Sequence, residues 1–453
     1  MARRGLTVDS RGRLLRDGER FRNIGLNYGG GVVRIYTQPS TTACEYTPSA
    51  EQDAMLDMAA AMKVKVVRVK ATPFWPAQWR YGVNGGVAGV AATAANRAAH
   101  YAAMDAFVAK CRARDIGVIW TLFFRHASVP DLAGQTIRAG WLTAGSATRN
   151  YAQAVTQEIV TRYLNEEAVY GYEWSNEVNH YNDASDATRG NYPAVNTSYG
   201  SAASYSAAND MFNGGELASV LSWWYDVVRA IDPDRIVLSG NGPGSYSQPG
   251  GTAGITSPMV SWNRDQARDN PTNCGTIHWY GNHLYGSANF RGLDSILTGV
   301  RHWQQVNGRG FVLGEFGNQP WQIAAISVAN GLATISTAAQ CPVEVGDSFG
   351  IAGTGTALDG QWLTVASINA AGTSITAPCS VSASYAGSVK GLQTMSPSRL
   401  GRMCSDVIKS GTDVGLVWMI DGDPGSPLWE SVSADLNSAL RAAITAANNA
   451  LGW

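Results

Sequence analysis

Two glutamates that each end an apolar stretch are the residues of this chain best suited to acid–base or nucleophilic chemistry. Residues 170–179 read YGYEWSNEVN, which places Asn176 beside Glu177 after an aromatic run. Residues 311–318 read FVLGEFGN, which places Glu315 near the end of a second apolar run. Short apolar runs of this kind are typical of buried strands. The sequence therefore predicts two strands that deliver two carboxyl groups to one site, as the hydrolysis of a glycosidic bond requires.

The spacing of the two glutamates indicates a (β/α)8 TIM barrel. They are separated by 315 − 177 = 138 residues, which accommodates three strand-plus-helix units of a barrel that has roughly 250 residues over eight units. We therefore assign Glu177 to strand 4 and Glu315 to strand 7, at the ends where barrel enzymes carry their active sites. The eight expected strands fall at 21–28, 64–70, 116–124, 170–179, 232–242, 276–286, 311–318 and 414–420.

The segments between these strands carry the remaining barrel elements. Residues 6–22 alternate glycine and charge around short apolar pairs, which predicts a hairpin at the barrel floor. Apolar residues recur at helical spacing before or after several strands. Helices are expected at 51–62, 98–114, 150–164, 216–231, 398–410 and 433–449.

The Asn-Glu pair and the GEFG motif, in this order, resemble the catalytic strands of clan A glycoside hydrolases, most nearly family 5, the cellulase and mannanase family. The resemblance covers residues 13–319 and 397–423. It implies a retaining, endo-acting β-glycosidase that needs no cofactor or metal. Glu177 would be the acid/base with a raised pKa, and Glu315 an ionised nucleophile about 5–5.5 Å away.

One departure from the family pattern leaves the acid open. Many relatives have proline after the Asn-Glu pair, and this chain has Val178. Glu173, four residues before Glu177 on the same expected strand, therefore remains a rival acid.

The resemblance also implies residues that support the pair. Asn176 would hold the sugar 2-hydroxyl, and Trp418 would form the floor under the sugar that is attacked. Arg68, within VVRVK, would lie beside the nucleophile and keep it ionised. Because a buried guanidinium needs a carboxylate partner in any case, a purely structural ion pair is the alternative.

Histidines and a tyrosine complete the expected set. His283 and Tyr285 match a His-x-Tyr motif on strand 6, in which the tyrosine donates a hydrogen bond to the nucleophile and the histidine orients the acid. His278, on the same strand, is the alternative to His283. His126, after strand 3, is expected to touch the sugar, and a solvated loop histidine is the alternative.

Aromatic residues are numerous, with 15 Trp and 18 Tyr in 453 residues. Trp75 and Trp79 fall in one loop of the catalytic face and are expected to bind substrate as a subsite wall. Most of the other aromatic residues are expected in the core.

Residues 320–390 differ from the rest, with short β-type runs, glycine turns and little charge. They predict a small β-barrel or β-sandwich domain inserted into a catalytic barrel of residues 1–319 and 391–453. The insertion resembles small β modules of phage virion and tail-associated proteins. A carbohydrate-binding module and a plain stabilising insertion are the alternatives.

Composition restricts the partners. The formal net charge of −1 gives no sign of a nucleic-acid or membrane-surface partner. No apolar run approaches the ~20 residues of a membrane span, and six scattered cysteines without CxxC spacing predict neither a metal nor a redox site. The first residues lack the apolar segment of a secretory signal. Action on an extracellular polysaccharide would then need other processing, cell lysis or attachment to a virion.

Two other functions stay open at this point. One is a non-catalytic carbohydrate-binding or virion structural protein built on a barrel, and the other is a transglycosylase that uses the same glycosyl-enzyme. Cellulose-like, mannan-like and bacterial exopolysaccharide substrates all fit the sequence.

Overall fold

The structure, a computed structural model, describes residues 5–33, 46–72, 94–177, 210, 212, 214–241, 272–279, 293–317, 321–337, 343–351, 354–392, 397–418 and 438–453. Every structural statement below concerns this part of the chain.

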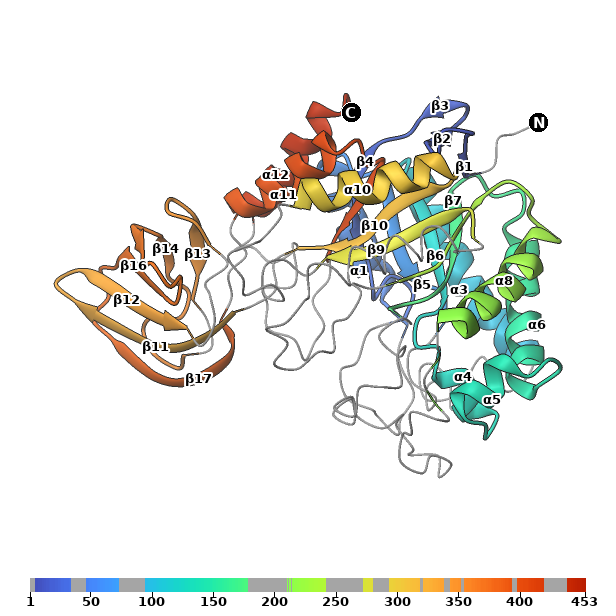
Figure 1. Cartoon of the computed structure of the whole chain (residues 1–453), viewed down its shortest axis with the longest axis horizontal. Helices are drawn as coiled ribbons and strands as arrows, with labels where there is room; N and C mark the ends of the chain where they lie inside the picture. The colour runs from blue at the N-terminus through green and yellow to red at the C-terminus, as the bar shows by residue number, and fades with distance from the viewer. Residues whose placement is uncertain are drawn as a thin grey trace.

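Eight parallel strands close into a barrel (Figure 1). They are β4 (Asn23–Asn27), β5 (Val66–Lys70), β6 (Gly117–Phe123), β7 (Val169–Ser175), β8 (Ile236–Leu238), β9 (Cys274–Trp279), β10 (Gly310–Phe316) and β18 (Val414–Val417). Each strand pairs with the next one in this series, and β18 closes on β4 with Val414 opposite Asn23. The predicted TIM barrel is thus confirmed, and β7 and β10 are its fourth and seventh strands.

Two strands differ from their expected bounds near the site. The fourth strand ends at Ser175, so Asn176 and Glu177 follow it rather than lying within it. Glu177 has a left-handed backbone, with φ of 52°, which ends the extended conformation. The sixth strand begins at Cys274 rather than at residue 276 and contains His278.

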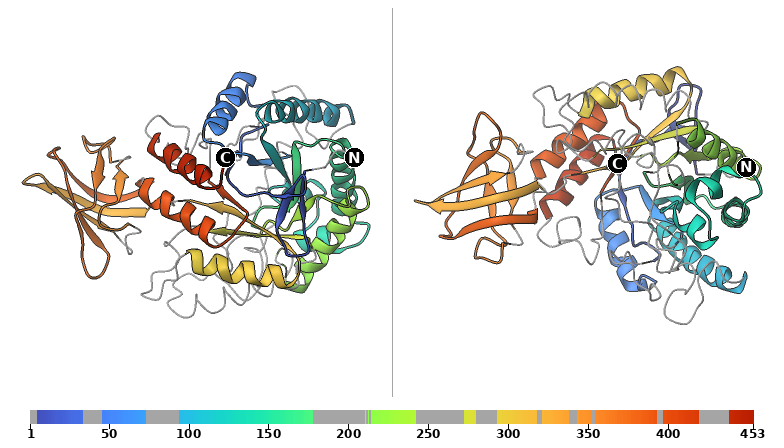
Figure 2. Two further views of the ribbon diagram at one scale, coloured as in Figure 1. Left: turned by 90° about the horizontal axis from the view of Figure 1, so that it is seen from above. Right: turned by 60° about the horizontal axis from the view of Figure 1, so that its bottom comes forward.

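Helices surround the barrel (Figures 1 and 2). They are α1 (Ser49–Ala61), α3 (Ala94–Ala113), α4 (Ser128–Leu132), α5 (Ile137–Leu142), α6 (Ala147–Arg162), α8 (Gly214–Arg229), α10 (Leu293–Val306), α11 (Pro397–Lys409) and α12 (Ser438–Ala450). The sequence did not predict α4, α5 or α10. For α4 and α5 the reason is length, because helices of 5 and 6 residues are too short to show a helical period.

The strand residues alternate between two environments, as a pleated strand requires. Outward residues such as Val67, Trp120 and Tyr172 pack with the helices in one large core. Inward residues near the N-terminal strand ends, such as Val66 and Ile119, form a separate apolar cluster. The inward positions near the other end are polar, and they form the site described below.

A three-stranded sheet forms the floor of the barrel, where the sequence predicted a hairpin. It consists of β1 (Leu6–Val8), β2 (Leu14–Arg16) and β3 (Glu19–Arg20). Leu6 and Leu14 belong to the inner apolar cluster, and the Leu14 N–H donates to Asp413 Oδ2 at 2.8 Å, just before β18. The sheet thus covers the barrel end opposite the two glutamates.

The chain between β10 and α11 forms antiparallel sheets. Its strands are β11 (Trp321–Ala329), β12 (Leu332–Thr337), β13 (Ser348–Gly350), β14 (Trp362–Thr364), β15 (Ser367–Ile368), β16 (Ser374–Pro378) and β17 (Ser384–Leu392). β13 and β14 form a two-stranded sheet and the others a five-stranded one. These strands, here called the β module, have a hydrophobic core of their own.

The β module projects from the side of the barrel where α11 and α12 lie (Figure 2). Polar contacts centred on Asp347 tie it to α11: both terminal nitrogens of Arg402 donate to the Asp347 carboxylate at 2.8 Å. The Ser398 hydroxyl donates to the same carboxylate at 3.0 Å. The residue just before β13 is therefore anchored to the barrel helix.

No helix within the described ranges is both long and apolar enough to cross a membrane.

Candidate active site

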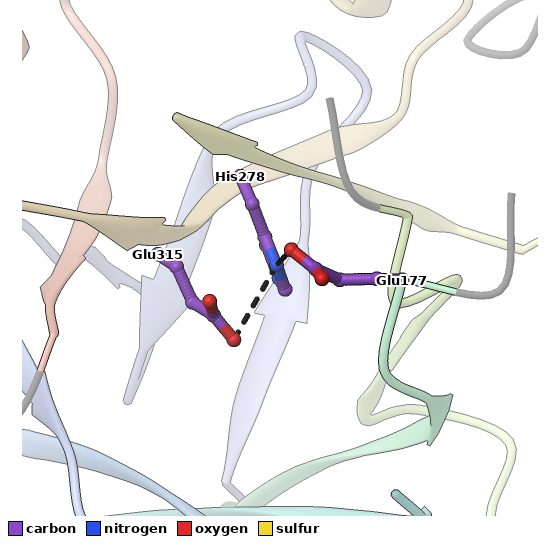
Figure 3. A group of neighbouring side chains, drawn as sticks. All are labelled: Glu177, His278 and Glu315. Carbon is purple, nitrogen blue, oxygen red and sulfur yellow. Dashed lines mark hydrogen bonds and ion pairs between the residues drawn. The ribbon is translucent and has the colours of Figure 1, made fainter. Parts of the chain in front are cut away.

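Three barrel strands bring Glu177, His278 and Glu315 together (Figure 3). His278 lies between the two glutamates, with Nδ1 2.9 Å from Glu177 Oε1 and 3.4 Å from Glu315 Oε1. One carboxylate oxygen of each glutamate and a ring nitrogen of His278 all lie within 4.8 Å of one another. The two carboxyl groups predicted to share a site therefore do so, at the C-terminal ends of β7 and β10.

Backbone contacts fix Glu177 beyond the end of β7. Its N–H donates to the Gly240 carbonyl at 2.6 Å, and the Asn176 N–H donates to the Phe124 carbonyl at 3.2 Å. A Cβ at Gly240 would lie 1.6 Å from the Ser175 carbonyl oxygen, so only glycine fits there. The left-handed backbone of Glu177 costs roughly 1–2 kcal/mol in a non-glycine residue. Strain of this kind, once observed, points to a functional position.

A β-bulge directs Glu315 into the barrel. The pairing of β10 with β9 shifts register between Leu313 and Glu315, and Glu315 then pairs with His278. Bulges often re-aim a side chain next to an active site. Gly314 lies at the bulge, and a Cβ there would lie 2.7 Å from His278 Nε2 and 2.5 Å from Thr276 Cγ2. The glycine before Glu315 thus makes room for the histidine that contacts both carboxylates.

Arg68 connects the residues of the site. Its Nη1 donates to Glu315 Oε1 at 2.7 Å and to Asn27 Oδ1 at 3.0 Å. Its Nε donates to Glu173 Oε2 and its Nη2 to Asn176 Oδ1, both at 2.6 Å. Burial opposes the charge of Arg68, but Glu173 and Glu315 hold its pKa above the ordinary value. The guanidinium is therefore charged, and it lies beside Glu315 as the sequence led us to expect, although it also forms the structural ion pair that was the alternative.

Two members of this network were not among the predicted site residues. Asn27, the last residue of β4, donates from Nδ2 to the Gly314 carbonyl at 2.9 Å. Thr121, on β6, donates to Glu173 Oε2 at 2.5 Å. The sequence signal for Asn27 was its position at the end of strand 1, whereas nothing in the strand GVIWTLF distinguished Thr121 from a core residue.

The protonation of Glu315 differs from the expectation. Burial raises its pKa to about 7, His278 and Arg68 oppose this shift, and the negative charge of Glu177 adds to it. The sequence had placed the raised pKa at Glu177 and an ionised carboxylate at Glu315. Because the two carboxyl groups are so close, this pKa belongs to the pair rather than to Glu315 alone. The pair therefore keeps one proton up to about neutral pH.

His126 is a buried residue that packs among aromatic side chains. It is 1% exposed and packs against Trp174 and Phe212, with ring centroids 6.3 and 6.2 Å away. Trp174 belongs to the outer core, since it alternates with the inward residue Glu173. Burial and Arg125 lower the pKa of His126 to about 3, so its imidazole is neutral. His126 is therefore not a solvated loop residue, and its contact with a sugar stays a prediction.

The other predicted residues divide into two groups. Trp418 directly follows β18, is half-buried, and donates its backbone N–H to the Phe316 carbonyl at 2.8 Å, which puts it next to the strand of Glu315. His283, Tyr285, Trp75 and Trp79 lie outside the described residues.

The electrostatics of the three side chains favour acid–base chemistry over metal binding. Two carboxylates and an imidazole are ligands that a divalent metal accepts. The charged Arg68, however, lies 2.7 Å from Glu315 Oε1 and would repel a cation there. A proton shared by the two carboxyl groups leaves the hydrogen bond from Arg68 to Glu315 in place.

Comparison with known proteins supports the fold. No family profile matches the sequence, and no curated protein matches it. Among solved structures, the endo-1,4-β-mannanase from Rhizomucor miehei is 10% identical, with 99% of both chains covered and a TM-score of 0.54. An endo-β-1,4-mannanase from Thermotoga petrophila is 13% identical over 96% of this chain and 77% of that one, with a TM-score of 0.51. A glycoside hydrolase family 5 mannosidase from Rhizomucor miehei is 11% identical over 100% and 98% of the chains, with a TM-score of 0.52. The chain is thus similar in fold to family 5 enzymes.

Proposed function

We propose that the protein is a retaining, endo-acting β-glycosidase of the family 5 kind. The observation that carries this proposal is that one carboxylate oxygen of Glu177 lies within 4.8 Å of one oxygen of Glu315, at the ends of the fourth and seventh barrel strands. Retaining glycosidases need carboxyl groups about 5–5.5 Å apart, whereas inverting enzymes need about 6.5–9.5 Å to admit a water. The short separation supports double displacement.

In the proposed mechanism, an oxygen of Glu315 attacks the anomeric carbon while Glu177 gives its proton to the leaving oxygen. The glycosidic bond breaks as the ester bond to Glu315 forms. Glu177, now ionised, then takes a proton from water, which attacks the same carbon and releases Glu315. The productive form keeps the one shared proton on Glu177, and Arg68 stabilises the ionised Glu315.

Exposure distinguishes Glu177 from its rival. The Glu177 side chain is 17% exposed, while Glu173 is fully buried and accepts hydrogen bonds from Arg68 and Thr121. A proton donor has to reach the substrate oxygen. These contacts favour Glu177 as the acid.

Asn176 and Trp418 are proposed to contact the sugar. Asn176 is adjacent to the acid, and Arg68 donates to its Oδ1, which leaves the amide nitrogen to donate to a 2-hydroxyl. Trp418 lies next to the strand of the nucleophile. His283, Tyr285, Trp75 and Trp79 remain proposed substrate contacts on the resemblance alone.

The mannanase names of the similar structures suggest β-1,4-mannan as the first polymer to test. Cellulose-like chains and bacterial exopolysaccharides should be tested beside it. Transglycosylation would use the same intermediate, and elongated products in the presence of an acceptor sugar would identify it.

We further propose that residues 320–390 are a separate domain that helps to hold a long polysaccharide. Trp362 supports this: it is 39% exposed and pairs with Gly350 across the two-stranded sheet. A Cβ at Gly350 would meet three indole ring atoms at 3.7 to 3.9 Å, so the ring lies beside the glycine. The exposed part of the ring could contact a sugar. Attachment to a virion is the alternative role for this domain.

The test of the proposed function is a polysaccharide screen with wild type, Glu177→Gln and Glu315→Gln. Hydrolysis of one polymer by wild type, lost in both variants while the fold is kept, supports the proposal. A well-folded protein that binds a polysaccharide without cleaving it would identify the non-catalytic alternative.

A further inference from the structure

Glu173 is buried beneath the proposed catalytic pair and, among the described contacts, is linked to it through Arg68. Its side chain is fully buried, and Arg68 is 2% exposed. Arg68 donates from Nε to Glu173 and from Nη1 to Glu315, at 2.6 and 2.7 Å. One guanidinium therefore serves two carboxyl groups, and the three adjacent buried groups carry a net charge of −1 when both carboxyl groups are ionised.

The contacts of Glu173 allow its charge to be removed without changing its shape. Oε2 accepts both of its hydrogen bonds, one from Arg68 and one from Thr121. Oε1 is buried and has no hydrogen-bond partner within the described ranges. A glutamine at this position can accept both bonds with its amide oxygen and place its NH2 group where Oε1 now lies.

We propose that Glu173 is a positioning residue that divides the charge of Arg68 between itself and Glu315, and so sets the pH range in which the catalytic pair holds one proton. The inference rests on the proposed function, because it concerns the same two carboxyl groups. The physical reason is that a second negative charge on Arg68 weakens the stabilisation that Arg68 gives to ionised Glu315. The proton of the pair is then held to higher pH than Arg68 alone would allow.

Other charges around Glu315 come from several strands. The charged or titratable neighbours on the described elements are Arg68 on β5, Glu177 after β7, His278 on β9 and, through Arg68, Glu173 on β7. Lys70 follows Arg68 by two residues on the same inward face of β5 and is 3% exposed. The nearby residues Asn27 of β4 and Trp418 after β18 are neutral. Glu173 is the negative charge in this set that makes no direct contact with the pair, which makes it the one to vary.

The first test is the pH profile of kcat/KM for Glu173→Gln with a small aryl glycoside. Removal of one negative charge favours loss of the proton from the pair, so both limbs of the profile should move to lower pH by about one to two units. Thr121→Val is the matched control, because it removes a hydrogen bond to Glu173 and leaves the charge. Its profile should keep the wild-type limbs even if its rate falls. Identical limbs in wild type and Glu173→Gln, or equal shifts in both variants, would show that Glu173 has only a structural role.

A second variant adds a negative charge beside Arg68 instead of removing one. Asn27→Asp adds a negative charge on Arg68 Nη1, which now donates to Asn27 Oδ1 at 3.0 Å. The limbs should move to higher pH, although loss of the hydrogen bond to the Gly314 carbonyl lowers the rate. If Glu173→Gln does not fold, this variant decides the question, and unmoved limbs overturn the proposal.

A spectroscopic readout separates this inference from the proposed function. Carbon-13 NMR of labelled glutamate carboxyl groups follows the titration of Glu315, assigned by its disappearance in Glu315→Gln. A lower midpoint in Glu173→Gln supports the charge-sharing role even if no hydrolysed substrate is found. Normal hydrolysis with an unchanged midpoint would leave the proposed function standing and reject the role of Glu173.

Discussion

Replacement of Gly314 by alanine tests whether the bulge on β10 positions His278 between the two glutamates. The added Cβ would lie 2.7 Å from His278 Nε2 and 2.5 Å from Thr276 Cγ2. Ordinary van der Waals contact begins at 3.4 Å, so the ring must retreat by about 3.4 − 2.7 = 0.7 Å. His278 is fully buried, so the ring cannot move into solvent and its Nδ1 contact with Glu177 must change.

The magnitudes follow from this displacement. Overpacking of a tight core site costs roughly 1–3 kcal/mol of unfolding free energy. A misplacement on the order of 1 Å in a catalytic group can reduce the rate by about 100-fold. We therefore expect Gly314→Ala to fold with reduced stability and to lose most of its kcat.

The assay pairs aryl-glycoside kinetics with urea unfolding, and Gly299→Ala is the control. Gly299 lies in α10, and a Cβ added there would meet no described atom within 4 Å. Alanine at this position should therefore stabilise the helix by about 0.5–1 kcal/mol and leave kcat unchanged. A Gly314→Ala enzyme with wild-type kcat would refute the link between the bulge, His278 and the acid.

Three further predictions concern the pair and the β module. Glu177→Gln should lose activity on polymer by about 100-fold or more, yet keep much of its activity on aryl glycosides whose leaving group needs no proton. Equal losses on both substrates would contradict the role of Glu177 as the acid. The folded state raises the pKa of Glu315 to about 7, so folded wild type binds one more proton than the unfolded chain between about pH 4.5 and 7. Wild type should therefore lose unfolding free energy as the pH rises through this range, whereas Glu315→Gln should not. Urea melts at several pH values should show the variant gaining stability relative to wild type. Trp362→Ala, or a short Gly-Ser link in place of residues 321–390, should weaken action on polymer and spare aryl glycosides, and an equal effect on both would instead place the module at the catalytic residues.

The barrel and the proposed catalytic pair could be predicted because each depends on local pattern. Apolar strands that end in Asn176-Glu177 and in Glu315 place carboxyl groups at the same end of any parallel barrel. The order of the strands around the barrel is then their order in the sequence. The short helices α4 and α5 carried no periodic signal and were missed, and the longer α10 was not predicted either.

The choice of histidine could not be predicted, because it depends on where the sixth strand begins and ends. The segment TIHWYGNHLYG contains two histidines among aromatic residues, and the sequence favoured His283 from the family motif. In the structure His278 lies on β9 between the two glutamates, and His283 is outside the described residues. The preference for His283 thus stays untested, while a histidine already occupies the position between the carboxyl groups.

The protonation state of the pair also could not be predicted from the sequence. It depends on burial, on the nearby charge of Glu177 and on the hydrogen bond from Arg68, all of which are tertiary features. Glu173 was considered as a rival acid, and its complete burial gives it a different position from that of Glu177.

The measurement that tests the central claim most directly is covalent trapping. A 2-fluoro glycoside with a good leaving group, incubated with the protein and followed by peptide mass spectrometry, should leave one glycosyl group on Glu315. Glu315→Gln should remain unlabelled under the same conditions. A label on Glu173 or Glu177, or turnover of a polysaccharide with inverted configuration and no label at Glu315, would contradict the account.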